Sequence, residues 1–253
     1  MLAGSTRLHA RDRHDHRHTQ INLNTHSSGG INWSGAAYIR EQRMQLHLIR
    51  HGQTNWNEER RIQGQSDSVL TELGIRQARA LGDRLRAIDY AAHYSSSSVR
   101  TRQTTEHAFP SATGVRFLDE LREIYLGPWE GSLYADIAES DPESYKHFWE
   151  QPHLFAVQGA ESFHDLQQRA VAAVAAIAAE HAGERVALVS HGALIKSYLC
   201  HVEGRPLDRF WEPPTMHNCC HSIVEITSDG NAKIVQYADE PVGLAQQTST
   251  GDY

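Results

Sequence analysis

Two histidines in this chain each follow an apolar, strand-like segment and each precede a glycine. His51 stands in Leu-Ile-Arg-His-Gly at residues 48–52, and His191 stands in Leu-Val-Ser-His-Gly at residues 188–192. A neutral imidazole can attack phosphorus without the charge repulsion that an anionic nucleophile meets at a phosphate dianion. Arg50 stands directly before His51 and is always charged. Its planar guanidinium group can bind two phosphate oxygens. These residue types favour phosphoryl transfer through a phosphohistidine.

Five segments, in a fixed order, resemble the histidine phosphatase superfamily, which is also called phosphoglycerate-mutase-like. They are LIRHGQTNWN (48–57), SSSSVRTRQTT (95–105), LREIYLGPWEG (121–131), GAESF (159–163) and VALVSHGALI (186–195). The resemblance covers about residues 44–236, and although each segment is a weak signal alone, five in order are a strong one. The second segment departs from the family, which usually has Ser-Pro-Leu where this chain has Ser-Ser-Ser at 96–98. This leaves the start of the next helix open, but not the arginine at position 100.

The resemblance implies a role for each of five residues. His51 is the expected nucleophile, and Arg50 and Arg100 are expected to neutralise the phosphate oxygens. His191 is expected to donate to the same oxygens. Glu123 is expected to protonate the leaving alcohol and then, as a carboxylate, to activate water.

The predicted phosphate-binding set is wider than the predicted catalytic set. It comprises Arg50, Asn57, Gln63, Gly64, Arg100 and His191. Glycines at 52 and 192 can adopt backbone angles closed to other residues, and they leave room for a ligand to approach the chain. No step of this chemistry requires a metal or another cofactor, and we expect none. If Glu123 is not the acid, Glu161 and Glu130 are the next candidates.

Strand-like and helical segments alternate from residue 44 onward. Strands are predicted at 45–49, 90–94, 115–118 and 186–190, and a hairpin at 222–227 and 232–236 across Ser-Asp-Gly-Asn. Helices are predicted after Thr71, near Ser98, twice within 133–150, and over 162–182 and 193–202. This order indicates an α/β fold: a three-layer α/β/α sandwich whose mostly parallel sheet has helices on both faces and an antiparallel edge strand. Ligands bind at the carboxyl ends of such strands, so both His-Gly pairs should meet there.

The composition limits the class of protein and its partners. The chain has 253 residues and a formal net charge of −7, which does not favour nucleic acid or an anionic membrane as a partner. Three cysteines, without metal-type spacing, indicate reduced thiols and a cytoplasmic protein. The longest apolar run, at 170–179, is too short to cross a bilayer. A homodimer is left open.

The first 43 residues differ from the rest of the chain. They contain five histidines, with 6 Lys or Arg against 3 Asp or Glu, and they show no sustained apolar period. We therefore predict a His-rich disordered extension at 1–43, a histidine phosphatase domain at 44–238 and a tail at 239–253. A natural translation start at Met44 is an open alternative.

The segment between the acid and the second histidine bears on the substrate. Only 68 positions separate Glu123 from His191, whereas the family's mutases carry a longer insertion with basic residues that grip a carboxylate. Tyr134 stands where those mutases have a lysine. Aromatic residues predominate instead: Tyr134, Tyr145, Phe148, Trp149 and Phe155. This favours a phosphatase for small-molecule phosphate monoesters, with broad specificity or a ribazole or sugar phosphate substrate. The alternatives are a mutase and, more remotely, a non-catalytic phospho-ligand binding module.

Overall fold

A computed structural model describes residues 43–242 of the chain. Almost all of the predicted extension at 1–43, and most of the predicted tail at 239–253, lie outside the described residues. The described strands form one sheet in the order β3-β2-β4-β1-β5-β6-β7. They are β1 (Met44–Arg50), β2 (Ala92–Ser96), β3 (Arg116–Leu118), β4 (Arg185–Ser190), β5 (His221–Ile226), β6 (Ala232–Tyr237) and β7 (Glu240–Pro241).

The sheet is parallel on one side and antiparallel on the other. Strands β3, β2, β4 and β1 run parallel, whereas β5 pairs antiparallel with β1, β6 with β5, and β7 with β6. The predicted mostly parallel sheet is confirmed, but its antiparallel side has three strands rather than a single edge strand. In the pairing of β1 with β4, Arg50 lies opposite Ser190. The two histidines that follow these residues therefore leave the sheet side by side.

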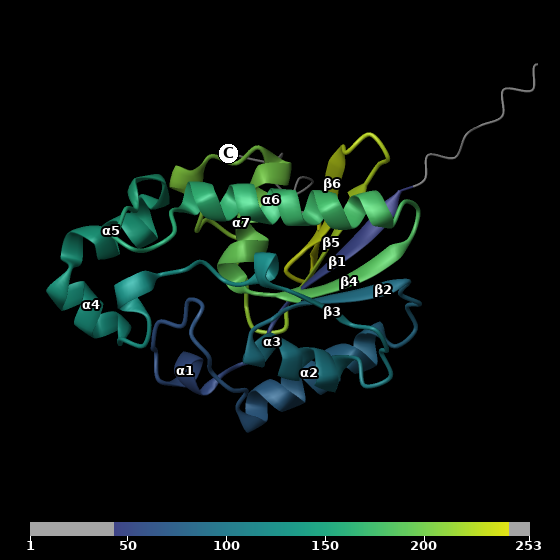
Figure 1. The fold of residues 1–253 in the computed structure, drawn as a ribbon, viewed down its shortest axis with the longest axis horizontal. Helices are drawn as coiled ribbons and strands as arrows, with labels where there is room; N and C mark the ends of the chain where they lie inside the picture. The colour runs from purple at the N-terminus through teal and green to yellow at the C-terminus, as the bar shows by residue number, and fades with distance from the viewer. Residues whose placement is uncertain (1–42, 243–253) are drawn as a thin grey trace, which may run out of the picture. The chain divides into compact units, whose positions relative to one another are not determined.

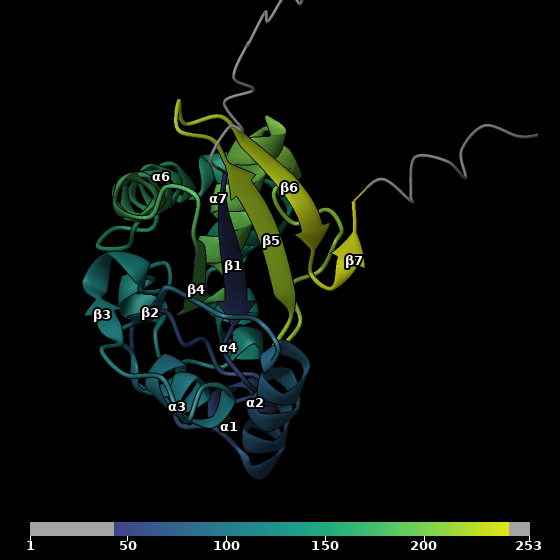
Figure 2. The same cartoon turned by 90° about the vertical axis from the view of Figure 1, so that its right-hand side faces the viewer.

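Helices cover both faces of the sheet (Figures 1 and 2). Helices α2 (Glu72–Leu85) and α3 (Val99–Ala108) lie on one face, and α6 (Phe163–Glu180) and α7 (Gly192–Glu203) lie on the other. Successive side chains of β1 point to opposite faces of the sheet. Leu48 belongs to the core cluster with α6 and α7, and Ile49 belongs to the cluster with α2. The three-layer prediction is confirmed, because each face buries its own set of apolar side chains.

Three smaller helices lie outside these layers: α1 (Asn55–Glu58), α4 (Tyr134–Ser140) and α5 (Pro142–Glu150). Helix α1 was not predicted, because four residues are too few to show a helical period. Local caps explain where the larger helices begin. The Thr71 hydroxyl accepts from the Gly74 amide at 3.1 Å, and Ser162 forms a capping box with Asp165 at the start of α6. Helix α3 begins after Ser98, whose side chain makes no cap hydrogen bond.

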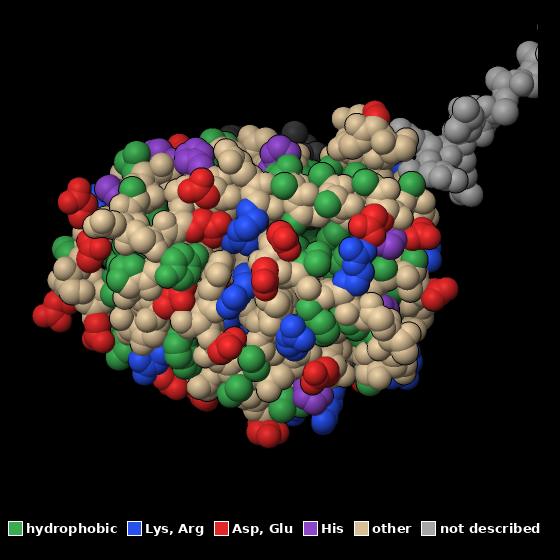
Figure 3. Space-filling view, viewed as in Figure 1, with side chains coloured by type: hydrophobic (Ala, Val, Ile, Leu, Met, Phe, Trp, Pro, Cys, Tyr) green, Lys and Arg blue, Asp and Glu red, His purple; other side chains and the backbone are tan. Residues whose placement is uncertain are grey.

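The surface in Figure 3 carries acidic and basic side chains interspersed over the face that it shows. Among the described residues, no helix is both long enough and apolar enough to cross a membrane.

A buried histidine pair joins β1 to β5. His47 Nδ1 and His221 Nε2 lie 2.9 Å apart, and the Tyr90 hydroxyl lies 3.1 Å from the same His47 nitrogen. Burial, aided by the charge of Arg185, lowers the pKa of His47 to about 4. Burial, aided by His47 and by the charge of Arg84, lowers the pKa of His221 to about 3. Both rings are therefore neutral in the folded protein at neutral pH.

Because of this buried pair, we predict that the free energy of unfolding decreases in mild acid. The unfolded chain takes up these protons near pH 6.5, whereas the folded chain resists them down to about pH 4 or 3. The contribution of the two neutral histidines to the free energy of unfolding is complete above pH 6.5 and decreases as the pH falls below that value. By pH 5 the loss should be about 1–2 kcal/mol per histidine. Urea unfolding at pH 7.5 and 5 should show this slope. His47→Gln should flatten it, and the exposed control His164→Gln should not.

Candidate active site

The ends of β1 and β4 open onto a cavity of about 260 Å³. Most of the predicted site residues line it: Arg50, His51, Asn57, Gln63, Gly64, Arg100 and Glu123. His191 lies directly behind this lining, with its ring centroid 5.4 Å from that of His51. The structure therefore brings all eight predicted site residues to one place.

His51 is held in the form that a nucleophile needs. Its Nδ1 lies 2.8 Å from the carbonyl oxygen of Gly52, so Nδ1 carries the proton and donates it there. The lone pair is consequently on Nε2. Burial, reinforced by the charges of Arg100 and Arg50, holds the pKa of His51 well below its usual range. The ring is therefore neutral and can attack phosphorus through Nε2.

The two arginines present their charge in different ways. Arg50 donates through Nη1 to the Met216 carbonyl, while its Nε is buried without a hydrogen-bond partner in the described part of the chain. Such an orphaned donor beside a cavity favours a bound anion. Arg100 is fully buried and donates to the carbonyls of Ser66 at 2.8 Å and Gly64 at 2.7 Å. Burial lowers the pKa of Arg100 to about 10, so it remains charged at neutral pH.

His191 differs from the expectation of a free phosphate donor. Arg100 Nε donates to its Nδ1 at 3.2 Å, and its Nε2 lies 2.8 Å from the Ser96 hydroxyl. Burial, with the charge of Arg100, holds the pKa of His191 well below its usual range. Both ring nitrogens are thus already engaged, and in this arrangement the ring holds Arg100 in place. Ser96 was not among the predicted residues, although it lies within the segment that carries Arg100.

The oxygens of the two predicted amide side chains already accept hydrogen bonds within the chain. Asn57 Oδ1 accepts from the backbone amide of Thr54 at 3.2 Å, and Gln63 Oε1 accepts from the Ser68 hydroxyl at 2.6 Å. Their NH₂ groups are therefore the ends available to a phosphate oxygen. Asn218, which the motifs did not indicate, donates to the carbonyl of His51 at 3.2 Å and to Asn57 Oδ1 at 3.4 Å.

Glu123 lies against the start of α7. Its carboxylate accepts from the backbone amides of Ala193 at 3.1 Å, Leu194 at 3.0 Å and its own neighbour Ile124 at 3.0 Å. The unpaired amides of a helix N-terminus favour a negative charge there. The carboxylate is therefore fixed at the wall of the cavity that also contains His51.

The two alternative acids are engaged elsewhere. Glu130 accepts from the backbone amides of Gln65 at 2.8 Å and Leu126 at 3.0 Å, and Glu161 pairs with Arg169 at 2.7 Å. Neither lines the cavity of His51. This geometry favours Glu123 over both as the proton donor.

Close packing, rather than an unusual backbone angle, explains the two glycines after the histidines. Neither glycine has a positive φ. A Cβ at Gly52 would lie 2.6 Å from the Gly74 carbonyl oxygen, and one at Gly192 would lie 3.3 Å from Arg50 Nε. Gly64 does have a positive φ, of +52°, and a Cβ there would lie 2.1 Å from Glu130 Oε1.

The outer part of the cavity is aromatic and apolar. Tyr134, Phe148 and Trp149 line it as predicted, and Trp211, which the motifs did not indicate, joins them. The rings of Trp149 and Trp211 lie 5.1 Å apart. The other two predicted aromatic residues, Tyr145 and Phe155, are not part of this lining, and Phe155 is buried in the core at 2% exposure.

The family model of the histidine phosphatase superfamily (branch 1) matches residues 46–240. The chain belongs to this superfamily. The identification made from the five sequence segments is thereby confirmed. A metal-independent phosphoserine phosphatase of Arabidopsis thaliana is 34% identical over 169 residues, which are 65% of this chain and 71% of that protein. A probable phosphoglycerate mutase GpmB of Salmonella choleraesuis is 35% identical over 165 residues, or 64% and 76% of the two chains.

Solved structures of similar proteins share the fold. Bacillus stearothermophilus YhfR is 42% identical, with a TM-score of 0.75 over 78% of this chain and 97% of its own. A mycobacterial glucosyl-3-phosphoglycerate phosphatase is 27% identical, with a TM-score of 0.70 over 78% and 99%. The superfamily and these phosphatases confirm the predicted enzyme class, a phosphoric monoester hydrolase. The roles of individual residues remain predictions.

Proposed function

We propose that this protein hydrolyses small-molecule phosphate monoesters through a phosphohistidine on His51. The observation that supports this most is the shared cavity. It joins a neutral histidine whose lone pair is on Nε2, the orphaned Nε of Arg50, the buried charge of Arg100 and the carboxylate of Glu123. These are the groups that phosphoryl transfer needs: a nucleophile, charge neutralisation and a proton donor.

The first half-reaction forms the phosphoenzyme. His51 Nε2 attacks phosphorus, a P–N bond forms, and the ester P–O bond breaks. The carboxyl group of Glu123 gives a proton to the leaving oxygen. Arg50, Arg100 and the NH₂ groups of Asn57 and Gln63 bind the phosphoryl oxygens.

The second half-reaction returns the enzyme to its starting form. The Glu123 carboxylate takes a proton from water, the water oxygen attacks phosphorus, and the P–N bond breaks. Inorganic phosphate leaves, His51 regains its lone pair, and Glu123 holds the proton for the next cycle. The side chains of the chain itself neutralise the phosphate, so turnover should persist in EDTA.

The leaving-group end of the cavity favours hydrolysis over mutase chemistry. A mutase for phosphoglycerate needs a free cation for the substrate carboxylate, and Tyr134 stands where the family's mutases carry a lysine. Beyond the phosphate arginines, the cationic side chain in the described lining is Lys196, and it is already engaged. Its Nζ donates to the carbonyls of Glu212 at 2.5 Å and Pro214 at 2.9 Å and lies 5.0 Å from the centroid of the Tyr237 ring.

A panel of phosphate monoesters, assayed in EDTA, tests the proposal. We expect phosphate release from several esters, with larger kcat/KM for aromatic or apolar leaving groups than for phosphoserine or 3-phosphoglycerate, because the cavity wall is aromatic. The 3-phosphoglycerate sample is also analysed for 2-phosphoglycerate. Isomerisation faster than phosphate release would establish the mutase alternative, which the similarity to GpmB represents. Loss of all turnover in EDTA would contradict the proposed chemistry.

A further inference from the structure

The backbone segment that carries Glu123 has little regular structure of its own. It follows a single 3-10 turn at Asp119–Leu121 and runs on to the next such turn at Gly127–Trp129. A backbone without a strand or helix ladder must find its hydrogen-bond partners elsewhere. Where those partners come from therefore decides how firmly the Glu123 carboxyl is held.

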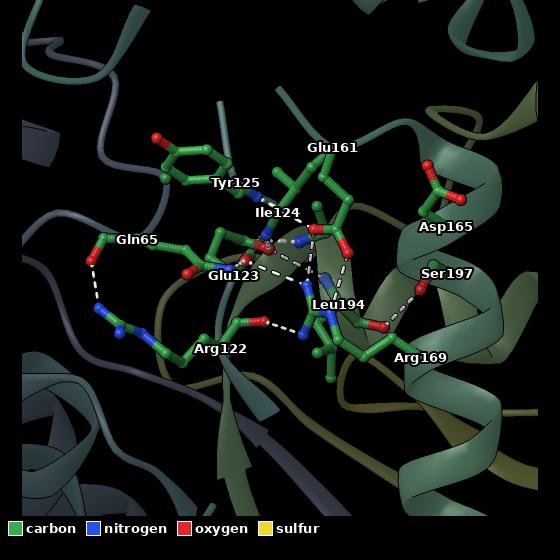
Figure 4. A network of polar contacts seen from close by, with 12 residues as sticks. Gln65, Arg122, Glu123, Ile124, Tyr125, Glu161, Asp165, Arg169, Leu194 and Ser197 are labelled. Carbon is green, nitrogen blue, oxygen red and sulfur yellow. Dashed lines mark hydrogen bonds and ion pairs between the residues drawn. The ribbon is translucent and has the colours of Figure 1, made fainter. Parts of the chain in front are cut away.

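Arg169, on α6, directs three of its five N–H donors to carbonyls of this backbone and the other two to the carboxylate of Glu161 (Figure 4). Its Nη1 donates to the carbonyls of Glu120 at 2.9 Å and Arg122 at 2.8 Å. Its Nη2 donates to the carbonyl of Glu123 itself at 3.2 Å. The remaining two bonds, from Nε at 2.9 Å and Nη2 at 2.7 Å, go to the carboxylate of Glu161. A lysine could not reproduce this planar, forked arrangement.

Glu161 forms hydrogen bonds with the backbone that follows Glu123. Its Oε2 accepts from the amide of Tyr125 at 3.0 Å, and its own amide donates to the Tyr125 carbonyl at 2.7 Å. The side chains of Arg169 and Glu161 are 21% and 14% exposed, so this pair is largely shielded from water. Together they contact the backbone immediately before, at and after the proposed acid.

We propose that the Arg169–Glu161 pair is a positioning device for the general acid. It sets the backbone of residues 120–125, and through it the place of the Glu123 carboxyl against the leaving oxygen. Neither side chain lines the cavity, so neither touches substrate. The inference rests on the proposed role of Glu123 as the acid. An error of about 1 Å in the place of a catalytic group can cost about 10²-fold in rate.

The test compares two leaving groups. Arg169→Lys and Glu161→Gln should each lower kcat/KM for an alkyl phosphate about 10- to 100-fold and for p-nitrophenyl phosphate less than about 3-fold, because only the alkyl alcohol needs the proton. Arg116→Lys is the control for the loss of an arginine–carboxylate pair outside the site, since Arg116 pairs with Glu180 and both side chains are about half exposed. This control should leave kcat/KM for both substrates unchanged. Normal turnover of p-nitrophenyl phosphate also shows that the variant is folded.

The same variants in the Glu123→Gln background separate the two proposals. Arg169→Lys should then have no further effect on the ratio of the two kcat/KM values, because the acid it positions is already gone. If Glu123→Gln alone leaves the ratio unchanged, the acid assignment fails. A second outcome is that Glu123→Gln changes the ratio, while Arg169→Lys and Glu161→Gln lower kcat/KM for both substrates equally or not at all. In that case only the positioning inference is wrong. An additive change in the double variant would also overturn it. Should Arg169→Lys not fold, Glu161→Gln carries the test.

Discussion

Replacing His51 with alanine should lower kcat by about 10⁴- to 10⁶-fold, the scale seen when an enzyme loses its nucleophile. The reason is that Nε2, left free by the bond from Nδ1 to the Gly52 carbonyl, would form the covalent bond to phosphorus. Brief exposure of the wild-type chain to a labelled phosphate ester, followed by acid and alkaline washes, should reveal a phosphoenzyme that is stable to base and labile to acid. His51→Ala should form none.

The exposed His164 provides the control for this experiment, because it lies on α6 outside the cavity. His164→Ala should keep both the phosphoenzyme and normal turnover. Substantial activity in His51→Ala would contradict the proposed mechanism. So would a label that survives acid but not base, since that behaviour indicates an acyl phosphate rather than a phosphohistidine.

The second large effect is expected for Glu123→Gln, and it should depend on the leaving group. An alkyl alcohol departs slowly without a proton, so kcat/KM for an alkyl phosphate should fall about 10²- to 10⁴-fold. The p-nitrophenolate ion leaves with little help, so kcat/KM for p-nitrophenyl phosphate should fall far less. Only kcat/KM is diagnostic, because the carboxylate also activates water in the later step that contributes to kcat.

Arg100→Ala is the companion variant. Arg100 would bind the phosphoryl group that both substrates share, so its loss should lower kcat/KM for both alike. Equal losses on the two substrates for Glu123→Gln would exclude it as the acid. Glu130 and Glu161 would be poor substitutes, because neither lines the cavity that contains His51.

Several features of this protein could be predicted from the sequence because their causes are local. Apolar strands alternating with amphipathic helices predicted the layered sheet, since each periodicity fixes which side chains face the core. His51 and His191 could be placed at one edge because parallel strands deliver the residues after them to the same side. Arg100 and Glu123 followed from the family's motifs, whose order along the chain is itself a sequence property.

The other features depend on contacts between segments far apart in the sequence, and only the tertiary structure decided them. Asn218 reaches His51 across 167 positions, and Arg169 reaches the carbonyl of Glu123 across 46. The tautomer of His51 is set by a backbone carbonyl, and both nitrogens of His191 are taken by Arg100 and Ser96. A sequence states which donors and acceptors a chain carries, but which of them are left over for a substrate depends on which ones the fold has already paired.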